Sequence, residues 1–324
     1  MISTSLARRA SRVWRLTAGA ALMAGVLAGC GGSTSQVDVF EPGRVLVFGD
    51  ELSMLTNDGH KYTINAVDDN DALQCRGNPI WVQLLAARYG MVFSECNPDA
   101  VANPKAKMLA TEGATVDELD TQIRTFTSGD SIRSDDLATV LVGMNDVLQA
   151  YASYPAESED ALTARMEEAG ERAASHVNDL ASSGARVLIS TMPDMGDTPF
   201  AKAEDLEHGD VRSRVLSRLS SAFNRSMRLK LTNDGSKLGL LLLDDLMHSM
   251  VRVPRAYGLA NTDTAVCDES APPPTCTNNT LISSDSSPTP TVTNYLWADS
   301  TRPTPVVHNA LGSQAVTRAT NNPF

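Results

Sequence analysis

The chain alternates short, uninterrupted apolar runs with longer segments of helical periodicity, and this alternation restricts the fold more than any other feature. Residues 44–48 form one such run, which stops at Gly49 and Asp50. A short run that is rich in β-branched residues and lacks polar alternation is typical of a parallel strand buried on both faces. We predict further strands of this kind at 137–142, 185–190 and 238–243.

Segments with helical patterns lie between these runs. Residues 79–90 carry apolar side chains at helical spacing, with Pro79 near the start and Gly90 at the end. Residues 157–183 form a long, charged amphipathic pattern, and residues 210–233 form another. Strands that alternate with helices predict an α/β fold with a mainly parallel sheet, in which ligands bind outside the carboxyl ends of the strands.

Two segments depart from this alternation. Residues 57–78 are rich in Asn and Asp, and residues 260–294 are rich in Thr, Ser, Pro and Asn. Because these residue types are typical of turns and loops, we predict a long loop for each segment. We find no internal repeat and no convincing linker, so residues 44–324 are predicted to form a single domain.

The composition restricts the class of protein. Of the 324 residues, 42% are hydrophobic and 20% are charged, which allows a sizeable core and excludes a chain that is disordered throughout. Acidic residues number 39 against 27 Lys and Arg, so the net charge is −12. Nucleic-acid binding requires clustered cations, and we therefore expect no nucleic acid as a partner. The aromatic content of 5% argues against a stacking platform for bases or sugars.

The amino-terminal segment has the pattern of an export signal. Residues 8–15 include four Arg, and residues 16–26 are apolar but too few for a stable membrane span. The segment ends in Leu27-Ala28-Gly29-Cys30, which resembles the lipobox of bacterial lipoproteins. The resemblance implies that residues 1–29 are a signal peptide and that Cys30 becomes lipidated.

The same resemblance implies a location. Gly31 stands where an Asp usually retains lipoproteins at the inner membrane of bacteria with two membranes. The implied protein is therefore anchored in the cell envelope through Cys30, at the outer membrane of a Gram-negative bacterium, with residues 30–43 as a flexible tether. An ordinary secretory signal with a chance Cys is the alternative.

Four cysteines remain after Cys30, namely Cys75, Cys96, Cys267 and Cys276. An even number of cysteines in an exported domain predicts two disulfides, for which three pairings are possible. We favour Cys75 with Cys96 and Cys267 with Cys276 because these pairs close short loops. Metal binding is the alternative, although no CxxC pair and no close His accompany these cysteines.

Five segments near the predicted strand and helix ends carry Gly, Asp, Asn, Pro and Trp in a fixed order. They are residues 47–53, 110–115, 142–146, 190–199 and 297–304, the last followed by His308. In this order they resemble the blocks F-G-D-S-L-S, A-x-G-G-A-x-T, G-x-N-D, N-x-P-P-x-G-x-T-P and W-x-D-x-x-H-P-T of the GDSL, or SGNH, lipase/esterase family. The resemblance covers roughly residues 44–315. It implies a three-layer sandwich with a central sheet flanked by helices, and hydrolysis of carboxylic esters, lipids or acylated polysaccharides without metal or organic cofactor.

The family's chemistry is acyl transfer to a serine. A Ser on the first turn attacks the ester carbonyl, a His takes its proton, and an Asp three residues before that His orients it. In this chain, the nucleophile position holds Glu51 and the base position holds Arg302. Asp299 still matches the orienting residue, and Gly113 and Asn145 match the oxyanion hole.

One interpretation is that the fold is kept while the activity is lost or vestigial. Glu51 would then aim its carboxylate at the oxyanion donors, and Arg302 would lie within pairing distance of it. These linked changes would replace a Ser–His hydrogen bond by a Glu–Arg ion pair. A structural or cleft-binding role would remain, with an ester, a lipid or an acylated glycan as ligand.

Two other interpretations retain an activity. In the first, displaced residues act, since Ser53 lies two positions after Glu51 and His308 lies six after Arg302. Both match family positions that usually have structural roles. In the second, Glu51 itself acts as a carboxylate nucleophile or base, which would require a water activator that we do not find in the sequence.

The remaining histidines give no sign of a metal centre. His60, His176, His208 and His248 are predicted on loops or charged helices, without a partner at ligand spacing. We therefore expect surface histidines and no metal site.

Overall fold

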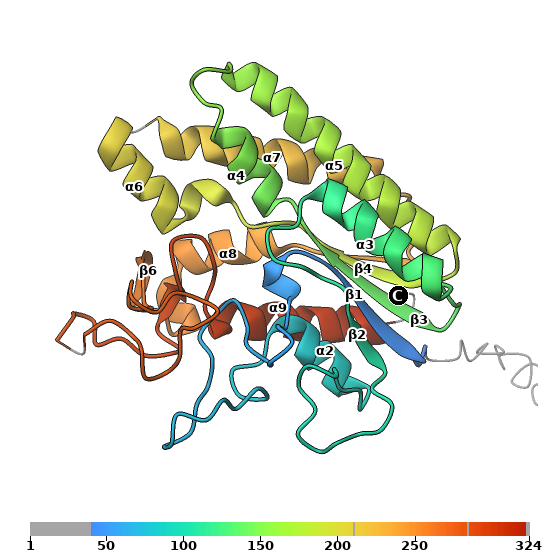
Figure 1. Ribbon diagram of the computed structural model, residues 1–324. Helices are drawn as coiled ribbons and strands as arrows, with labels where there is room; N and C mark the ends of the chain where they lie inside the picture. Colours follow the sequence, from blue (N-terminus) through green and yellow to red (C-terminus); the bar gives the residue numbers. More distant parts are fainter. Residues whose placement is uncertain (1–39, 210, 284, 322–324) are drawn as a thin grey trace, which may run out of the picture. The chain divides into compact units, whose positions relative to one another are not determined.

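A five-stranded parallel sheet forms the centre of the domain (Figure 1). The computed structural model describes residues 40–209, 211–283 and 285–321, so the predicted signal peptide, Cys30 and tether residues 30–39 lie outside the described residues. The strands follow the order β2–β1–β3–β4–β5, and every neighbouring pair is parallel. Their bounds are β1 Arg44–Gly49, β2 Ala106–Met108, β3 Asp136–Leu141, β4 Arg186–Ser190 and β5 Leu238–Leu241.

Helices cover both faces of this sheet, which confirms the predicted α/β class (Figure 1). Helices α3, α5 and α7 lie on one face, and α2 and α9 lie on the other. The helix bounds are α2 Trp81–Arg88, α3 Val116–Gly129, α4 Met144–Tyr151, α5 Glu159–Ser182, α6 Pro199–His208, α7 Arg212–Lys230, α8 Leu243–Arg252 and α9 Pro305–Thr320. Short 3₁₀ turns are η1 Glu51–Ser53, η2 Met195–Asp197 and η3 Pro254–Tyr257. None of the helices in the described part of the chain is long and apolar enough to span a membrane.

The predicted strands and helices are present, with their ends shifted by a few residues. The largest error in a strand is at 238–243, where β5 ends at Leu241 and Leu243 already begins α8. Asp244 and Asp245 occupy the first turn of that helix, where carboxylates interact favourably with the helix dipole. An apolar run alone does not show where a strand gives way to a helix.

The segment 260–294 was predicted as a loop, and this prediction is wrong at its beginning. Strand β6 (Asn261–Ala265) pairs with β7 (Tyr295–Trp297) as a separate two-stranded sheet. The polar, partly exposed sequence of β6 contains no apolar run, so periodicity could not reveal it. A small second core supports this sheet, and its buried residues are Ile64, Val266, Cys267, Cys276, Tyr295 and Ala298.

Both local disulfides form as predicted. Cys75 pairs with Cys96, and Cys267 pairs with Cys276, with Cα–Cα distances of 5.7 and 5.8 Å. The first disulfide ties the loop before α2 to the segment before β2, and the second lies in the small core beside β7. The two disulfides therefore fix the long loops in place. Because all four cysteines are paired, the alternative of a cysteine metal site is excluded.

A buried ion pair joins β1 to β3 at the beginning of both strands. Arg44 donates from Nε and Nη2 to the two carboxylate oxygens of Asp136, each at 2.7 Å, and Asp136 is fully buried. The fork of the guanidinium matches the carboxylate in one orientation, so this pair favours the observed register of Arg44 opposite Asp136. The register in turn brings the far ends of β1 and β3 to the same edge of the sheet.

Candidate active site

The turn after β1 presents Glu51 at the carboxyl edge of the sheet. Gly49 has a φ of +123°, and a Cβ at this position would lie 1.9 Å from the carbonyl oxygen of Leu141, so only glycine fits there. Asp50 caps the following 3₁₀ turn by accepting a hydrogen bond from the Leu52 backbone at 3.0 Å. The first residue of that turn is Glu51, whose side chain is 2% exposed.

The Glu51 carboxylate lies where Gly113 and Asn145, the two predicted oxyanion donors, meet. Its Oε2 atom accepts hydrogen bonds from the backbone N–H of Gly113 and from Nδ2 of Asn145, both at 3.0 Å. The Gly113 loop follows β2, and Asn145 lies in the first turn of α4, directly after β3. Oxyanion donors in acyl-transfer enzymes lie about 2.7–3.1 Å from the oxygen that they stabilise. One oxygen of Glu51 therefore fills the position in which these two donors would hold a reacting oxyanion.

The other carboxylate oxygen binds Arg302. Arg302 donates from Nη2 to Oε1 of Glu51 at 3.0 Å and from Nη1 to Oδ2 of Asp299 at 2.7 Å. The second oxygen of Asp299 accepts the backbone N–H groups of Thr301 and Arg302 at 2.9 and 2.6 Å. The ion pair suggested by the sequence forms, and Asp299 orients Arg302 from the position that would orient a catalytic His.

Burial and the neighbouring charges shift the pKa values of Arg302 and Asp50. Burial opposes the charge of Arg302, but the Asp299 and Glu51 carboxylates outweigh it and raise the pKa of the guanidinium above its ordinary value. The guanidinium also lies over the Tyr62 ring, 5.1 Å from its centroid. Burial and then the charge of Glu51 raise the pKa of the neighbouring Asp50 well above its usual range. Glu51, Asp299 and Arg302 thus share a largely buried site, and the neighbouring Asp50 is held toward its neutral form.

Ser53 lies in the same 3₁₀ turn but faces the interior. Its side chain is fully buried, and its hydroxyl accepts a hydrogen bond from Nε1 of Trp81 at 3.2 Å. This places the hydroxyl under α2 rather than beside Gly113 and Asn145, which contact Glu51.

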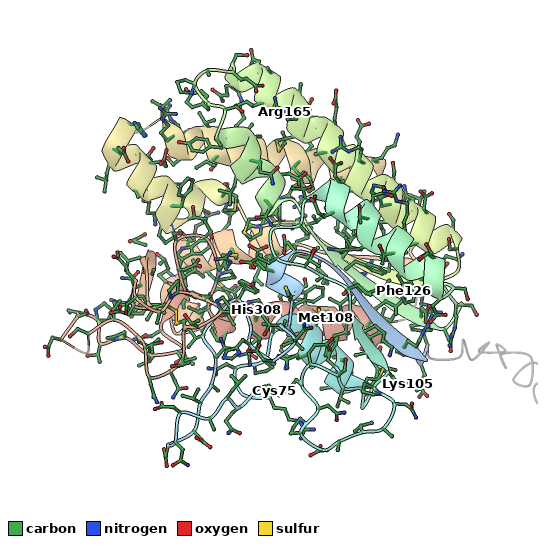
Figure 2. The ribbon with its side chains drawn as sticks, viewed as in Figure 1. Cys75, Lys105, Met108, Phe126, Arg165 and His308 are labelled. Carbon is green, nitrogen blue, oxygen red and sulfur yellow. A yellow bond between two sulfur atoms is a disulfide. The ribbon has the colours of Figure 1, made fainter. Side chains whose placement is uncertain are left out.

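His308 lies in the first turn of α9 and is labelled in Figure 2. It is 2% exposed, and its Nε2 has no hydrogen-bond partner among the described residues. Burial, together with the nearby charge of Lys61, lowers the pKa of the imidazole to about 3. No hydrogen bond within the described chain joins it to Ser53, so the structure does not assemble these two residues as it assembles Glu51 and Arg302.

A groove of about 590 Å³ lies near the cluster, and Thr301 is the lining residue that adjoins it in sequence. Its lining includes three aromatic residues, namely Tyr151, Tyr154 and Phe200, and Thr301, which directly precedes Arg302. Polar side chains also line it, namely Glu204, His208 and Arg212. The Tyr151 and Tyr154 rings stack with centroids 6.2 Å apart, and Phe200 meets Tyr151 edge-on at 5.9 Å. Sequence periodicity could not reveal this aromatic lining, because its members come from α4, the following turn and α6.

The buried environment of His308 predicts that its imidazole stays neutral throughout the physiological range. Because its pKa is depressed in the folded state, its contribution to stability is present above pH 6.5 and is lost as pH falls toward 3. Proton NMR titration of the ring resonances, assigned with His308→Gln, should show no midpoint between pH 5 and about pH 8. A midpoint near 6.5, the ordinary value, would show instead that His308 is accessible and able to act as a base.

Comparison with known proteins finds an acyltransferase among the relatives of this chain. Over 239 residues the chain is 27% identical to a phosphatidylcholine-sterol acyltransferase of Aeromonas hydrophila, a match that covers 68% of this chain and 64% of the relative. The chain thus spans less than two thirds of that relative's length.

Similar solved structures include a lipolytic-family protein and an esterase. One is a member of the lipolytic G-D-S-L family from Veillonella parvula, with 12% identity, a TM-score of 0.38 and coverage of 85% of this chain and 96% of that one. Another is an acetylxylan esterase from Geobacillus stearothermophilus, with 11% identity, a TM-score of 0.43 and coverage of 88% and 97%.

The family model of the GDSL-like lipases and acylhydrolases matches residues 45–270. This range begins in β1 and includes the Glu51 turn, the Gly113 loop and the Asn145 helix, which together surround the Glu51 carboxylate. More than two thirds of the chain therefore matches, and the chain belongs to the GDSL-like lipase/acylhydrolase family.

Proposed function

We propose that this chain is a GDSL-family protein that no longer hydrolyses esters through a covalent serine intermediate and that binds a ligand in its cleft instead. The observation that carries this proposal is the double engagement of Glu51. One oxygen accepts the hydrogen bonds of the proposed oxyanion donors Gly113 and Asn145, and the other pairs with Arg302. A substrate carbonyl could reach those donors only by displacing a buried carboxylate from three hydrogen bonds.

The chemistry of the two exchanged residues supports the same proposal. A carboxylate is held permanently where oxyanion charge would develop only in the transition state, so the donors lose their differential effect. Arg302 cannot accept a proton near neutral pH, because a guanidinium stays charged. The site therefore holds neither an activated hydroxyl nor a base at the positions where the family carries them.

Displaced catalysis through Ser53 and His308 is the alternative function. The buried hydroxyl of Ser53 is engaged by Trp81, and the depressed pKa of His308 makes it a weak base at neutral pH. Both observations favour structural roles for these residues. Direct use of Glu51 as nucleophile is disfavoured in turn, because Arg302, Gly113 and Asn145 already engage both of its oxygens.

We propose the aromatic groove as the place where the apolar part of a ligand binds. Helix α4 carries Asn145 at its beginning, and Leu148 and Tyr151 of the same helix line the groove, so the lining begins about one helical turn from Asn145. Tyr154 and Phe200 extend the apolar lining. The Aeromonas relative is named for phosphatidylcholine and sterol, both of which are largely apolar. A ligand with an acyl chain fits this lining better than a purely polar one.

We further propose that the protein acts at the bacterial cell envelope, held by a lipid on Cys30. The support is the arrangement of basic, apolar and small residues before Cys30 in the sequence. Fractionation of cells that express Cys30→Ser should move the protein from the membrane fraction to the soluble fraction, because the acyl chains supply the membrane affinity. Unchanged membrane association of this variant would contradict the anchor.

A serine-directed fluorophosphonate tests the loss of hydrolysis. The wild type should remain unlabelled and should turn over p-nitrophenyl esters no faster than background. The double variant Glu51→Ser/Arg302→His should become labelled at position 51, because Gly113, Asn145 and Asp299 would again support a serine.

A matched control makes that test specific. Adding Asp299→Asn to the double variant should suppress its labelling strongly, as loss of the orienting Asp costs about 10⁴-fold in a serine triad. Labelling of the wild type at Ser53 would establish displaced catalysis. A double variant that folds but stays unlabelled would show that residues other than those at positions 51 and 302 also prevent catalysis.

Binding of a fluorescent short-chain phosphatidylcholine, kept below its micellar concentration, tests the groove. Phe200→Ala should weaken binding about tenfold, since it removes roughly 1.4 kcal/mol of aromatic contact. Leu206→Ala is the matched control, because Leu206 lies on the same helix but is 91% exposed and does not line the groove. Equal affinities of the wild type and Phe200→Ala would place the ligand elsewhere.

A further inference from the structure

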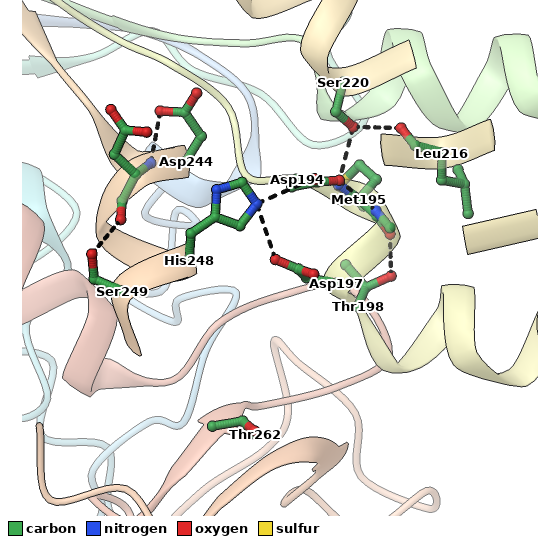
Figure 3. Close-up of polar contacts among 12 residues, drawn as sticks. Asp194, Met195, Asp197, Thr198, Leu216, Ser220, Asp244, His248, Ser249 and Thr262 are labelled. Carbon is green, nitrogen blue, oxygen red and sulfur yellow. Dashed lines mark hydrogen bonds and ion pairs between the residues drawn. The ribbon is translucent and has the colours of Figure 1, made fainter. Parts of the chain in front are cut away.

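A second polar cluster lies outside the Glu51 site, where η2 meets α8 (Figure 3). Nε2 of His248 lies 3.2 Å from Oδ2 of Asp194 and also 3.2 Å from Oδ2 of Asp197. The three atoms all lie within 4.8 Å of one another. The sequence predicted a surface His248 without ligand partners; the side chain is 44% exposed, but the prediction that it has no partners is wrong. Two carboxylates from a segment about fifty residues earlier in the chain meet its ring.

Local structure fixes the two carboxylates before any ligand arrives. Asp194 and Asp197 are three residues apart across a 3₁₀ turn, which places them on the same side because such a turn repeats every three residues. The other oxygen of Asp194 accepts the backbone N–H of Gly196 at 2.8 Å, which leaves Oδ2 directed at His248.

The turn that carries these carboxylates is itself packed tightly on α7. A Cβ on Gly196 would lie 2.0 Å from the Ser217 hydroxyl oxygen, and the Met195 backbone donates to the Ser220 hydroxyl at 3.0 Å. Thr198 closes the turn by donating to the Met195 carbonyl (Figure 3). The positions of the carboxylates thus follow from the rigid packing of the backbone rather than from flexible surface chains.

The cluster has more acceptors than its single imidazole can satisfy. A neutral imidazole has at most one hydrogen on Nε2, yet that atom is equally far from two carboxylates. The Asp194 and Asp197 carboxylates therefore lie close together around one imidazole nitrogen. The Lys202 ammonium, which also acts on Asp197, donates its hydrogen bonds to Asp263 and to the Thr262 carbonyl.

We propose that Asp194, Asp197 and His248 bind one divalent transition-metal ion, for which Zn²⁺ is the best match. One imidazole nitrogen and two carboxylate oxygens form a donor set that zinc accepts in proteins, usually with four ligands at about 2.0–2.2 Å. Ligand atoms around such a tetrahedral ion lie roughly 3.3 Å apart, close to the 3.2 Å separations here. The His248 side chain is 44% exposed, so the remaining position faces water.

The ion would join two elements next to the candidate active site. It would link η2 to α8, and the backbone of Phe200, just after η2, donates to the carbonyl of Ser300 at 2.9 Å. Ser300 directly follows Asp299, which orients Arg302. The proposed site does not depend on whether the chain hydrolyses esters.

Isothermal titration of the chelator-treated full chain with ZnCl₂ tests the proposal, with cobalt absorption spectra as a second measurement. We expect one saturable zinc site per chain and visible bands of tetrahedral Co²⁺ that zinc abolishes. His248→Ala should weaken binding about tenfold or more, because loss of even an outer-shell partner of a metal ligand costs that much. Asp197→Asn should weaken zinc binding as well. Agreement between the two variants would show that the loss does not come from misfolding of His248→Ala alone.

The chain supplies its own matched control in His208. This residue lies 3.8 Å from Glu204 and 3.7 Å from Glu207, but all three occupy one helix, and two of them are exposed. His208→Ala should leave zinc affinity and the cobalt spectrum unchanged. Absence of saturable binding, unchanged affinity in His248→Ala, or an equal loss in His208→Ala would each overturn the assignment.

Discussion

The placement of the Glu51 carboxylate determines how the rest of the cleft can work. A carboxylate that is 2% exposed would be costly without partners, and here Gly113, Asn145 and Arg302 each donate to it at 3.0 Å. The donors come from three separate segments that follow β2, β3 and β7. Glu51 therefore connects three segments at the carboxyl edge of the sheet, where ligands usually bind in parallel α/β folds.

This arrangement resembles a serine triad in which the neutral Ser and His are replaced by the charged Glu51 and Arg302. In a serine triad, a neutral hydroxyl and imidazole become charged only as the reaction proceeds, and fixed dipoles stabilise that change. Glu51 and Arg302 instead form an ion pair in the resting protein, and Asp299 orients Arg302 by accepting its hydrogen bond. The same scaffold thus stabilises a permanent ion pair, which is why we interpret the cleft as a binding site.

Much of this site could be predicted from sequence, because strand ends and short motifs carry strong local constraints. Gly49 marks the end of β1 since only glycine tolerates the approach to Leu141, and the motifs around Gly113 and Asn145 place donors at the same edge. The separation of Glu51 and Arg302 by 251 positions did not matter, because both positions belong to recognisable motifs.

Features that depend on tertiary packing could not be predicted in this way. Strand β6 is polar and forms only because β7 and a small disulfide-linked core support it. The approach of His248 to Asp194 depends on how α8 packs against η2, and neither segment carries a motif for it. The inward orientation of Ser53 likewise follows from the position of Trp81 on α2.

The most direct test of the account is a double-mutant cycle between Glu51→Gln and Arg302→Met, measured by urea unfolding at neutral pH. If the guanidinium compensates the carboxylate in the oxyanion position, each single variant should be destabilised and the two should couple by about 2 kcal/mol. The double variant should then be more stable than the sum of the single effects predicts. Additivity within about 0.5 kcal/mol would contradict the account, because it would mean that Glu51 and Arg302 do not act as a pair.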